Sequence, residues 1–281
     1  MRKAIQRESI DKELRNRLWS AIQLEIWDKW ETHHLGYTSQ SSQWVEKLVD
    51  RIWLHYWKEP LDTVPVFKGA SYGKSSYDII RDFFFEAEWW VVYDFIEFLI
   101  KASPVAVWAD RLKETVNRFL EDENAAYRIV GNEIVEITDE QEIEAVESTL
   151  DHATKSVREH LSRSLELLSD HKNPDYRNSI KESILAVESA CKSIAALPKA
   201  TLGDCIKVLK TRGSIHPAFE QALLKLYGYA NDEGGIRHAL TEESVTPTYA
   251  DAKFMLVAVS AFTSFLWTKA AELRIELSKD G

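Results

Sequence analysis

The chain has 281 residues, of which 45% are hydrophobic and 28% are charged, a balance typical of a soluble globular protein large enough for two domains. Its formal net charge of -10 excludes general coating of nucleic acid and disfavours anionic membrane surfaces, so any nucleic-acid contact has to be local. Ten glycines and seven prolines are few for a loop-rich or many-stranded protein, and we expect mostly helices.

Nothing at the N-terminus resembles a targeting segment, because Met1 is followed by Arg2, Lys3 and a polar stretch without an apolar run of the signal-peptide type. We therefore expect a cytoplasmic protein that does not bind membranes. Cys191 and Cys205 are the only cysteines, too few for a disulfide framework or a four-thiolate zinc site, and we expect both to be reduced.

The first part of the chain has helical periodicity. Apolar residues recur about every four positions over residues 9–30, which predicts an amphipathic helix, and residues 44–57 predict a second one. Residues 77–101 are strongly apolar, but acidic residues interrupt them too often for a bilayer span, so they predict one core helix. No histidine accompanies those acids at metal-ligand spacing, and we expect no metal site there.

The period changes at residues 127–138, where β-branched residues flank Gly131 and Asn132, and this pattern predicts a β-hairpin. Residues 138–141 then match a helix capping box. We therefore place the domain join at the hairpin, with one helical domain over residues 1–138 and a second over residues 139–281. The predicted fold class is all-α, with two helical domains and a small β-hairpin near the join.

The second part of the chain returns to helical periodicity. Apolar stripes predict a long helix over residues 143–168, another over residues 179–197 and two short ones over residues 201–210 and 217–229. Residues 251–269 predict a strongly apolar helix, but only fifteen residues separate its two lysines, too few to span a bilayer. Burial in a bundle or in a dimer seam explains this helix better.

The most informative segment is residues 229–239, where Arg237 and His238 follow the paired glycines Gly234 and Gly235. An imidazole exchanges protons near neutral pH and a guanidinium binds phosphate, so the two side chains together can act on an RNA backbone or a nucleotide without a metal or cofactor. The alternative is structural: two glycines can end a helix, with both side chains bonded to their own loop.

No other part of the sequence competes with this segment. It contains no phosphate-binding loop, no dinucleotide fingerprint, no paired-histidine zinc helix and no nucleophile elbow. Most other histidines, among them His160 and His171, lie within or at the ends of predicted helices and are expected to face solvent. Glu188, on the flank of an apolar stripe, is a candidate to pair with Arg237 or to orient His238.

Two sets of residues resemble known families. Residues 3–19, the hairpin and residues 139–143 resemble one of the N-terminal domain types of AbiJ-like abortive-infection proteins. Residues 173–190, 226–229, 235–238 and 251–256 resemble the helical domain that accompanies it, a divergent HEPN-type bundle. The combination implies a phage-defence protein.

The HEPN resemblance implies an all-helical bundle that often forms homodimers. In active members it implies a metal-independent ribonuclease whose arginine and histidine are separated by four to six residues. His238 matches the motif histidine, but the positions expected for arginine hold Asn231, Asp232 and Glu233, and Arg237 adjoins His238 directly. We therefore name Arg237 and His238 as candidate catalytic residues and Asn231, Asp232 and Glu188 as candidate substrate-binding residues, with no metal and no cofactor.

Three functional hypotheses follow. The first is a dimeric HEPN-type ribonuclease that its N-terminal half restrains until phage infection. The second is a non-catalytic module that binds RNA or a nucleotide and dimerises. The third is a structural partner or sensor whose aromatic N-terminal half recognises a phage or host protein. Exposed tryptophans would be its sign, and it loses its motivation if the five at positions 27, 30, 44, 53 and 57 are all buried.

Overall fold

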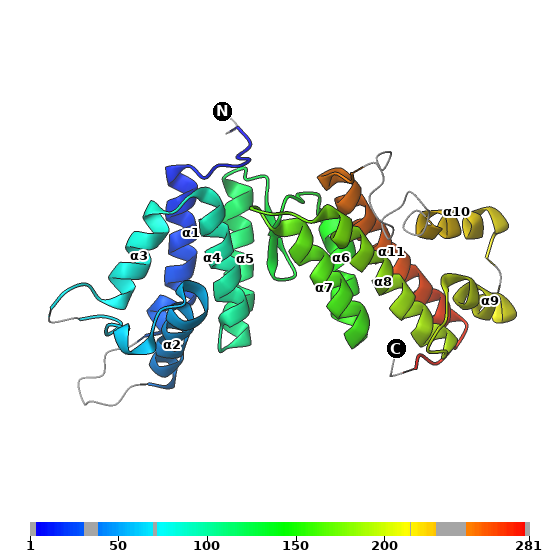
Figure 1. Ribbon diagram of the computed structural model, residues 1–281, viewed down its shortest axis with the longest axis horizontal. Coiled ribbons are helices and arrows are strands. Elements are labelled where there is room, and N and C mark those ends of the chain that lie inside the picture. Colours follow the sequence, from blue (N-terminus) through cyan, green and yellow to red (C-terminus); the bar gives the residue numbers. More distant parts are fainter. Residues whose placement is uncertain (1–3, 31–38, 70–71, 214, 229–245, 279–281) are drawn as a thin grey trace. The chain divides into compact units, whose positions relative to one another are not determined.

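The computed structural model describes residues 4–30, 39–69, 72–213, 215–228 and 246–278 (Figure 1). Contacts divide the chain into two compact units, Met1–Glu136 (unit 1) and Ile137–Gly281 (unit 2). The predicted join, between residues 138 and 139, lies two residues beyond this division. Each unit is described by itself below.

The all-α fold class is confirmed, since the described residues form eleven α-helices and a single two-stranded hairpin. Unit 1 contains α1 (Lys12–Glu25), α2 (Gln40–Arg51), α3 (Ser76–Glu86), α4 (Trp89–Ala102), α5 (Ala106–Asp122), β1 (Arg128–Val130) and β2 (Glu133–Val135). Three short turns of other helix types accompany them: η1 (Trp27–Lys29), η2 (Ile52–Trp57) and η3 (Leu61–Thr63). Unit 2 contains α6 (Glu140–His152), α7 (Lys155–Ser169), α8 (Tyr176–Ala195), α9 (Leu202–Arg212), α10 (Pro217–Gly228) and α11 (Tyr249–Glu272).

Two helices predicted as continuous are each broken in two. Residues 77–101 divide at Ala87, whose backbone is extended, into α3 and α4. Residues 143–168 divide at Ala153, also extended, into α6 and α7. At the second break the Arg158 guanidinium donates to the carbonyl oxygens of Leu150 and Asp151, so an arginine satisfies backbone groups at the end of α6. An apolar stripe that continues on both sides of a break does not reveal it.

The predicted capping box at residues 138–141 is also wrong in detail. The N-cap of α6 is Asp139, whose carboxylate accepts from the backbone N–H groups of Gln141 and Glu142. A capping box of Thr201 and Asp204 begins α9.

The core of unit 1 is aromatic. Trp27, Phe84, Tyr93 and Phe95 are fully buried, and rings meet mostly edge to face or tilted, as between Phe83 and Phe95. Trp27 and Trp53 are buried, whereas Trp30, Trp44 and Trp57 are half-buried and pack against the same core. The tryptophans therefore contribute mainly to the core of unit 1.

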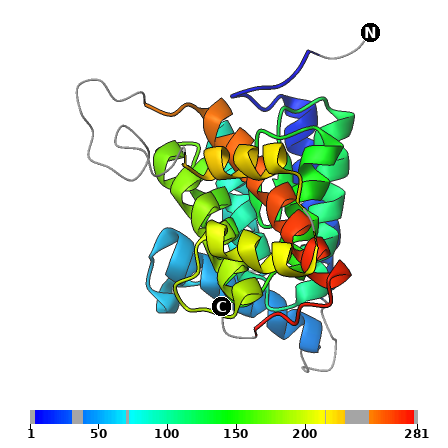
Figure 2. The same ribbon diagram turned by 90° about the vertical axis from the view of Figure 1, so that its right-hand side faces the viewer.

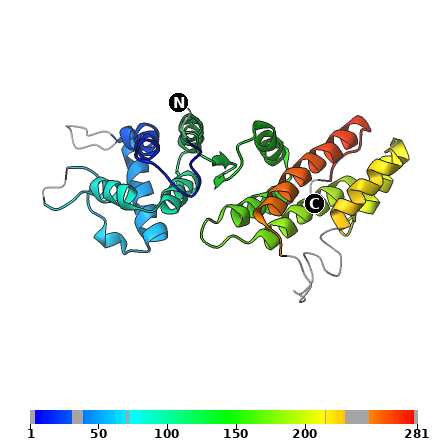
Figure 3. The ribbon, with the colours of Figure 1, turned by 90° about the horizontal axis from the view of Figure 1, so that it is seen from above.

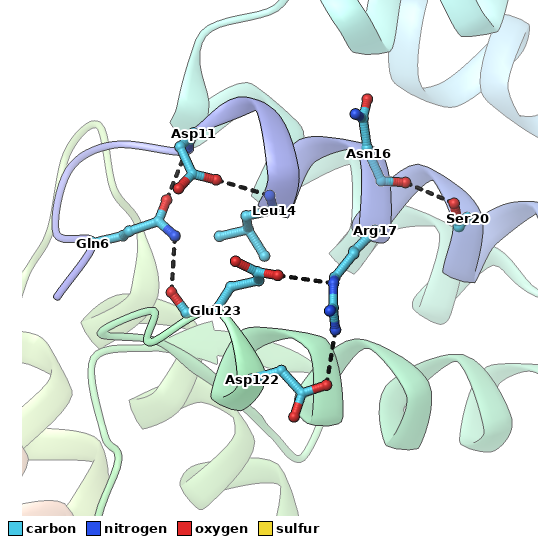
Figure 4. A network of polar contacts seen from close by, with 8 residues as sticks. All are labelled: Gln6, Asp11, Leu14, Asn16, Arg17, Ser20, Asp122 and Glu123. Atoms are coloured by element: carbon cyan, nitrogen blue, oxygen red, sulfur yellow. Dashed lines mark hydrogen bonds and ion pairs between the residues drawn. The ribbon is translucent and has the colours of Figure 1, made fainter. Parts of the chain in front are cut away.

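The N-terminal segment is held to the chain after α5 by backbone hydrogen bonds of Gln6 with Asn124 and Ala126. The buried side chain of Gln6 adds a second set of contacts (Figure 4). Gln6 is 6% exposed, and its amide donates to the Glu123 carbonyl at 2.9 Å and accepts from the Asp11 backbone N–H at 2.8 Å. Asp11 in turn caps α1 by accepting from the Leu14 N–H, and Arg17 pairs with Asp122 and Glu123. This network fixes α1 against α5.

The predicted hairpin is confirmed. β1 and β2 pair antiparallel with Ile129 opposite Ile134, and Gly131 takes the positive φ of 62° that the turn requires. The buried Glu97 carboxyl of α4 accepts from the Ile134 N–H at 2.5 Å, and Lys101 pairs with Glu133 at 2.7 Å. Two acidic side chains, one from α4 and one from β2 itself, are thus buried at the hairpin.

Unit 2 is a bundle in which α7 and α8 run antiparallel. Small polar side chains line their contact, and the Ser164 hydroxyl donates to the Ser179 carbonyl at 2.9 Å. The long helix α11 packs on α6, α7 and α8, and Figure 3 shows it between α6 and the α9–α10 pair. Figure 2 views the unit from the side of α9 and α10. The ring of Phe219 on α10 packs edge to face on that of Phe265 on α11.

Helix α11 is long and apolar enough to cross a membrane by length and composition, but these are also properties of core helices. Its inner side is buried in unit 2, while Phe254 on its outer side is 60% exposed. Cys191 and Cys205 are free thiols, as predicted, buried on α8 and α9. A hydrogen bond with the Cys205 thiol, together with burial, raises the pKa of Cys191.

Candidate functional site

Four of the five candidate site residues, Asn231, Asp232, Arg237 and His238, lie outside the described residues. The fifth, Glu188, lies on α8 and is half-buried. The structure describes the helices that border residues 229–245 in the sequence, α10 before them and α11 after them.

The first border is the end of α10. The phenol of Tyr227 donates a hydrogen bond of 2.6 Å to Oε1 of Glu188. Tyr227 is the second-last residue of α10, one residue before Gly228, and it is half-buried like its partner. This charge-assisted bond ties the end of α10 to α8 at the point where the candidate segment begins.

The second border is the start of α11. Thr248 is its N-cap: the Thr248 hydroxyl accepts from the Asp251 N–H, and the Asp251 carboxylate accepts from the Thr248 N–H and hydroxyl. These bonds hold the pKa of Asp251 below its usual value. The next residue, Tyr249, places its ring edge to face against Tyr176 at the start of α8. Both borders of residues 229–245 therefore rest on α8.

This arrangement indicates the structural role of Glu188. Its carboxylate accepts the phenol of Tyr227, so it anchors α10, and a carboxylate can accept further hydrogen bonds from a guanidinium or an imidazole. Val187, the residue before it, belongs to the buried stripe of α8. Glu188 itself is half-buried and therefore lies on the flank of this stripe. Glu188 thus contacts the last turn of α10, the helix that precedes the segment with Arg237 and His238 in the sequence.

Sequence reasoning missed Tyr227 as part of this site. Its position near the end of a predicted helix was visible, but helical periodicity gives no partner on another helix. The hydrogen bond to Glu188 spans 39 residues and depends on how α8 and α10 pack.

Two other histidines were expected to face solvent, and neither does so fully. Nδ1 of His160 on α7 lies 2.7 Å from Oε2 of Glu182 on α8, and both side chains are half-buried. His171 is half-buried in the turn before α8, and burial lowers its pKa to about 4. The predictions failed because α7 and α8 pack closely enough to cover residues at the edge of their stripe.

Comparison with known proteins gives one match. A family model described as AbiJ N-terminal domain 4 matches residues 1–152 of the 281. No curated protein and no solved structure matches the chain. The matched region passes the division after Glu136 and ends at His152, the last residue of α6.

Proposed function

The chain belongs to the AbiJ N-terminal domain 4 family, and from that premise we propose that it acts in abortive infection, a defence of the cell against phage. The match extends over more than half of the chain, including all of unit 1. We propose that this action takes place in the cytoplasm.

Unit 2 is proposed to be the effector, a HEPN-like bundle with Arg237 and His238 at its site. The observation that carries this proposal is the bond between Tyr227 and Glu188, because it brings α10 and α8 together where the segment with the arginine and histidine begins. The capped start of α11 supports it from the other border. The segment is therefore a connection between anchored helices of one bundle.

The proposed reaction is metal-independent cleavage of RNA. His238 would accept the proton of a ribose 2′-hydroxyl, whose oxygen attacks the adjacent phosphorus, and the bond to the 5′-oxygen breaks with that oxygen taking up a proton. Arg237 would bind the phosphate as negative charge develops. Glu188, Asn231 and Asp232 would hold the two side chains or the RNA.

The test is incubation of the purified full-length protein with transfer RNA in the presence of a chelator. We expect fragments with the wild type, and at least a hundredfold slower cleavage with His238→Ala and with Arg237→Ala. His216→Ala, which removes a different histidine of unit 2, one that is exposed, is the matched control and should cleave like the wild type. Intact RNA with every variant, wild type included, removes the ribonuclease proposal.

A second candidate is a non-catalytic module that holds a nucleotide or an RNA end. One observation favours it: Arg237 and His238 are adjacent, whereas the motif of active HEPN members separates them by four to six residues. Calorimetric titration with nucleotides and short RNAs tests this candidate. Saturable heat that Arg237→Ala abolishes, without any cleavage, supports it, and no heat with any ligand rejects it.

We further propose that the protein is a homodimer formed through the outer face of α11. That face carries Phe254, 60% exposed, and one and two turns further Ala258 and Ala261, so it is apolar over these two turns. Phe219 of α10 extends it by packing on Phe265. A second copy of the same helix is the self-complementary occupant of such a stripe.

Unit 1 is proposed to recognise the phage or host protein that triggers the response. The tryptophans contribute little to such a surface because they pack in or against the core. Aliphatic residues between α2 and α3 are more exposed, namely Leu54, Leu61 and Val66. Substitution of all three by serine should abolish protection from phage while leaving the RNA cleavage rate unchanged.

A further inference from the structure

Helix α6 belongs to the N-terminal family by sequence and to unit 2 by its contacts. The family match ends at His152, the last residue of α6, yet Val146 and Leu150 of this helix are buried in unit 2, where α6 packs on α11. A piece of the N-terminal family domain is therefore part of the bundle that we propose as the effector.

The register between α6 and α11 is defined at two points. Lys253 pairs with Glu142 at 2.6 Å, and the Thr149 hydroxyl donates to the Ser260 carbonyl at 3.0 Å. Both contacts join residues 111 positions apart, so the two helices run parallel without slipping over two turns. A displacement of α6 would therefore act along the first half of α11.

The packing around α11 leaves polar groups unsatisfied. The hydroxyls of Ser260 and Thr263 are buried without a hydrogen-bond partner, although both side chains are fully inaccessible. At the α7–α8 contact, by contrast, the Ser164 hydroxyl reaches Ser179. Unsatisfied buried hydroxyls destabilise this packing relative to one that partners them, so they favour a second arrangement of α11 against its neighbours.

Helix α6 is also the first helix of unit 2 along the chain. Only residues 136–139 separate β2 from its first residue, and Ile137 among them is fully buried. In the sequence, the first turn of α11 follows the segment that carries Arg237 and His238. A displacement of the hairpin can thus displace α11, because residues 136–139 join the hairpin to α6 and α6 packs on α11.

We propose that α6 is the control helix of unit 2: its register against α11, set by the Glu142–Lys253 and Thr149–Ser260 contacts, determines whether the first turns of α11 are held in place. The consequence for activity rests on the proposed function of Arg237 and His238. The mechanical part of the proposal concerns α6 and α11 alone.

Hydrogen–deuterium exchange of the full-length protein tests it, and in the first arm the substituted residue lies far from the residues whose exchange is measured. Thr149→Val removes the hydroxyl that reaches Ser260, eleven residues from the start of α11. We expect exchange over residues 249–253 to become about fivefold faster, the effect of one lost hydrogen bond on a local opening equilibrium. The matched control, Ser164→Ala, removes a hydroxyl that reaches the carbonyl of another helix and should leave residues 249–253 unchanged.

A charge exchange provides the second arm. Glu142→Lys and Lys253→Glu should each speed exchange at the start of α11, and the double variant should restore the wild-type rate. Faster exchange confined to α6 and the neighbourhood of Ser260, with residues 249–253 unaffected in all variants, would overturn the proposal. Because this readout needs no RNA, coupling without cleavage refutes only the proposed ribonuclease.

Discussion

Tyr227 and Glu188 join the end of α10 to α8 by a hydrogen bond of 2.6 Å from phenol to carboxylate. The two residues are 39 positions apart, and the bond is made one residue before the chain leaves α10. In the sequence, residues 229–245 follow directly after this helix, and the bond makes the end of α10 depend on α8.

Removal of the Tyr227 hydroxyl should loosen this contact. We expect Tyr227→Phe to lower the free energy of unfolding of unit 2 by about 1 kcal/mol. This is less than a fully buried charge-assisted hydrogen bond contributes, because both side chains are partly exposed. Urea denaturation followed by circular dichroism measures the change. Tyr72→Phe, which alters an exposed phenol, is the control, and equal stabilities of the two variants would show that the bond contributes nothing.

The buried Glu97 predicts an unusual dependence of stability on pH. Burial, reinforced by Glu133, raises the pKa of Glu97 to about 8 from its usual value of 4.5. The folded state therefore binds a proton that the unfolded state releases, so the contribution to stability is complete below pH 4.5 and is lost as pH rises through about 8.

Tryptophan fluorescence can follow this effect in unit 1, since nine of the ten tryptophans precede residue 137 and the tenth is Trp267. The urea midpoint of the fluorescence transition should fall between pH 6 and pH 8.5. Glu97→Gln, which keeps a neutral side chain, should flatten that fall, whereas Glu114→Gln on the exposed side of α5 should not. A midpoint equally pH-dependent in Glu97→Gln would refute the assignment.

The Gln6 side chain, which bonds to both Glu123 and Asp11 and is called the Gln6 clamp here, predicts that one substitution near the N-terminus destabilises the whole of unit 1. Gln6→Leu removes two hydrogen bonds and leaves the buried Glu123 carbonyl and the Asp11 N–H without this partner. We expect a loss of about 2–4 kcal/mol, read from the same fluorescence transition. The same change at the exposed Gln43 should alter stability by less than about 0.5 kcal/mol. Similar losses at both positions would contradict the role of the clamp.

The proposed dimer predicts that substitution of Phe254 halves the mass of the protein in solution. Light scattering coupled to size exclusion should give twice the 32.4 kDa of the chain for the wild type and a single chain's mass for Phe254→Lys. Leu277→Lys, which alters an exposed apolar residue after α11, should remain dimeric. A wild type that elutes as a single chain at tens of micromolar would rule out this interface.

Much of the fold follows from sequence because helical periodicity reports burial. The stripe over residues 179–197 predicts α8, which ends where Ala196 takes a left-handed conformation, and the change of period at residue 127 predicts the hairpin. The breaks at Ala87 and Ala153 escaped prediction because apolar residues continue across them. At Ala153 the break also depends on Arg158, whose bonds to α6 carbonyls form only once the helices meet.

The candidate site was predictable only in part. Residue types identify Glu188 as a carboxylate near an apolar stripe, but its bond with Tyr227 depends on the packing of α10. The same limit applies to His160, whose partner Glu182 lies on the neighbouring helix. Asn231, Asp232, Arg237 and His238 remain predictions from the sequence.

The central claim, a defence against phage that acts through the arginine and histidine of unit 2, is tested most directly by infection of cells that express the full-length protein. Plaque counts and culture density should be compared for the wild type, His238→Ala, the matched His216→Ala and an empty vector across a panel of phages. Wild type and His216→Ala should reduce plaques by at least tenfold for at least one phage, with culture growth arrested at high multiplicity, and His238→Ala should plate like the vector. Protection by His238→Ala equal to that of the wild type would contradict the claimed site, and plating of the wild type like the vector with every phage would contradict the defence role itself.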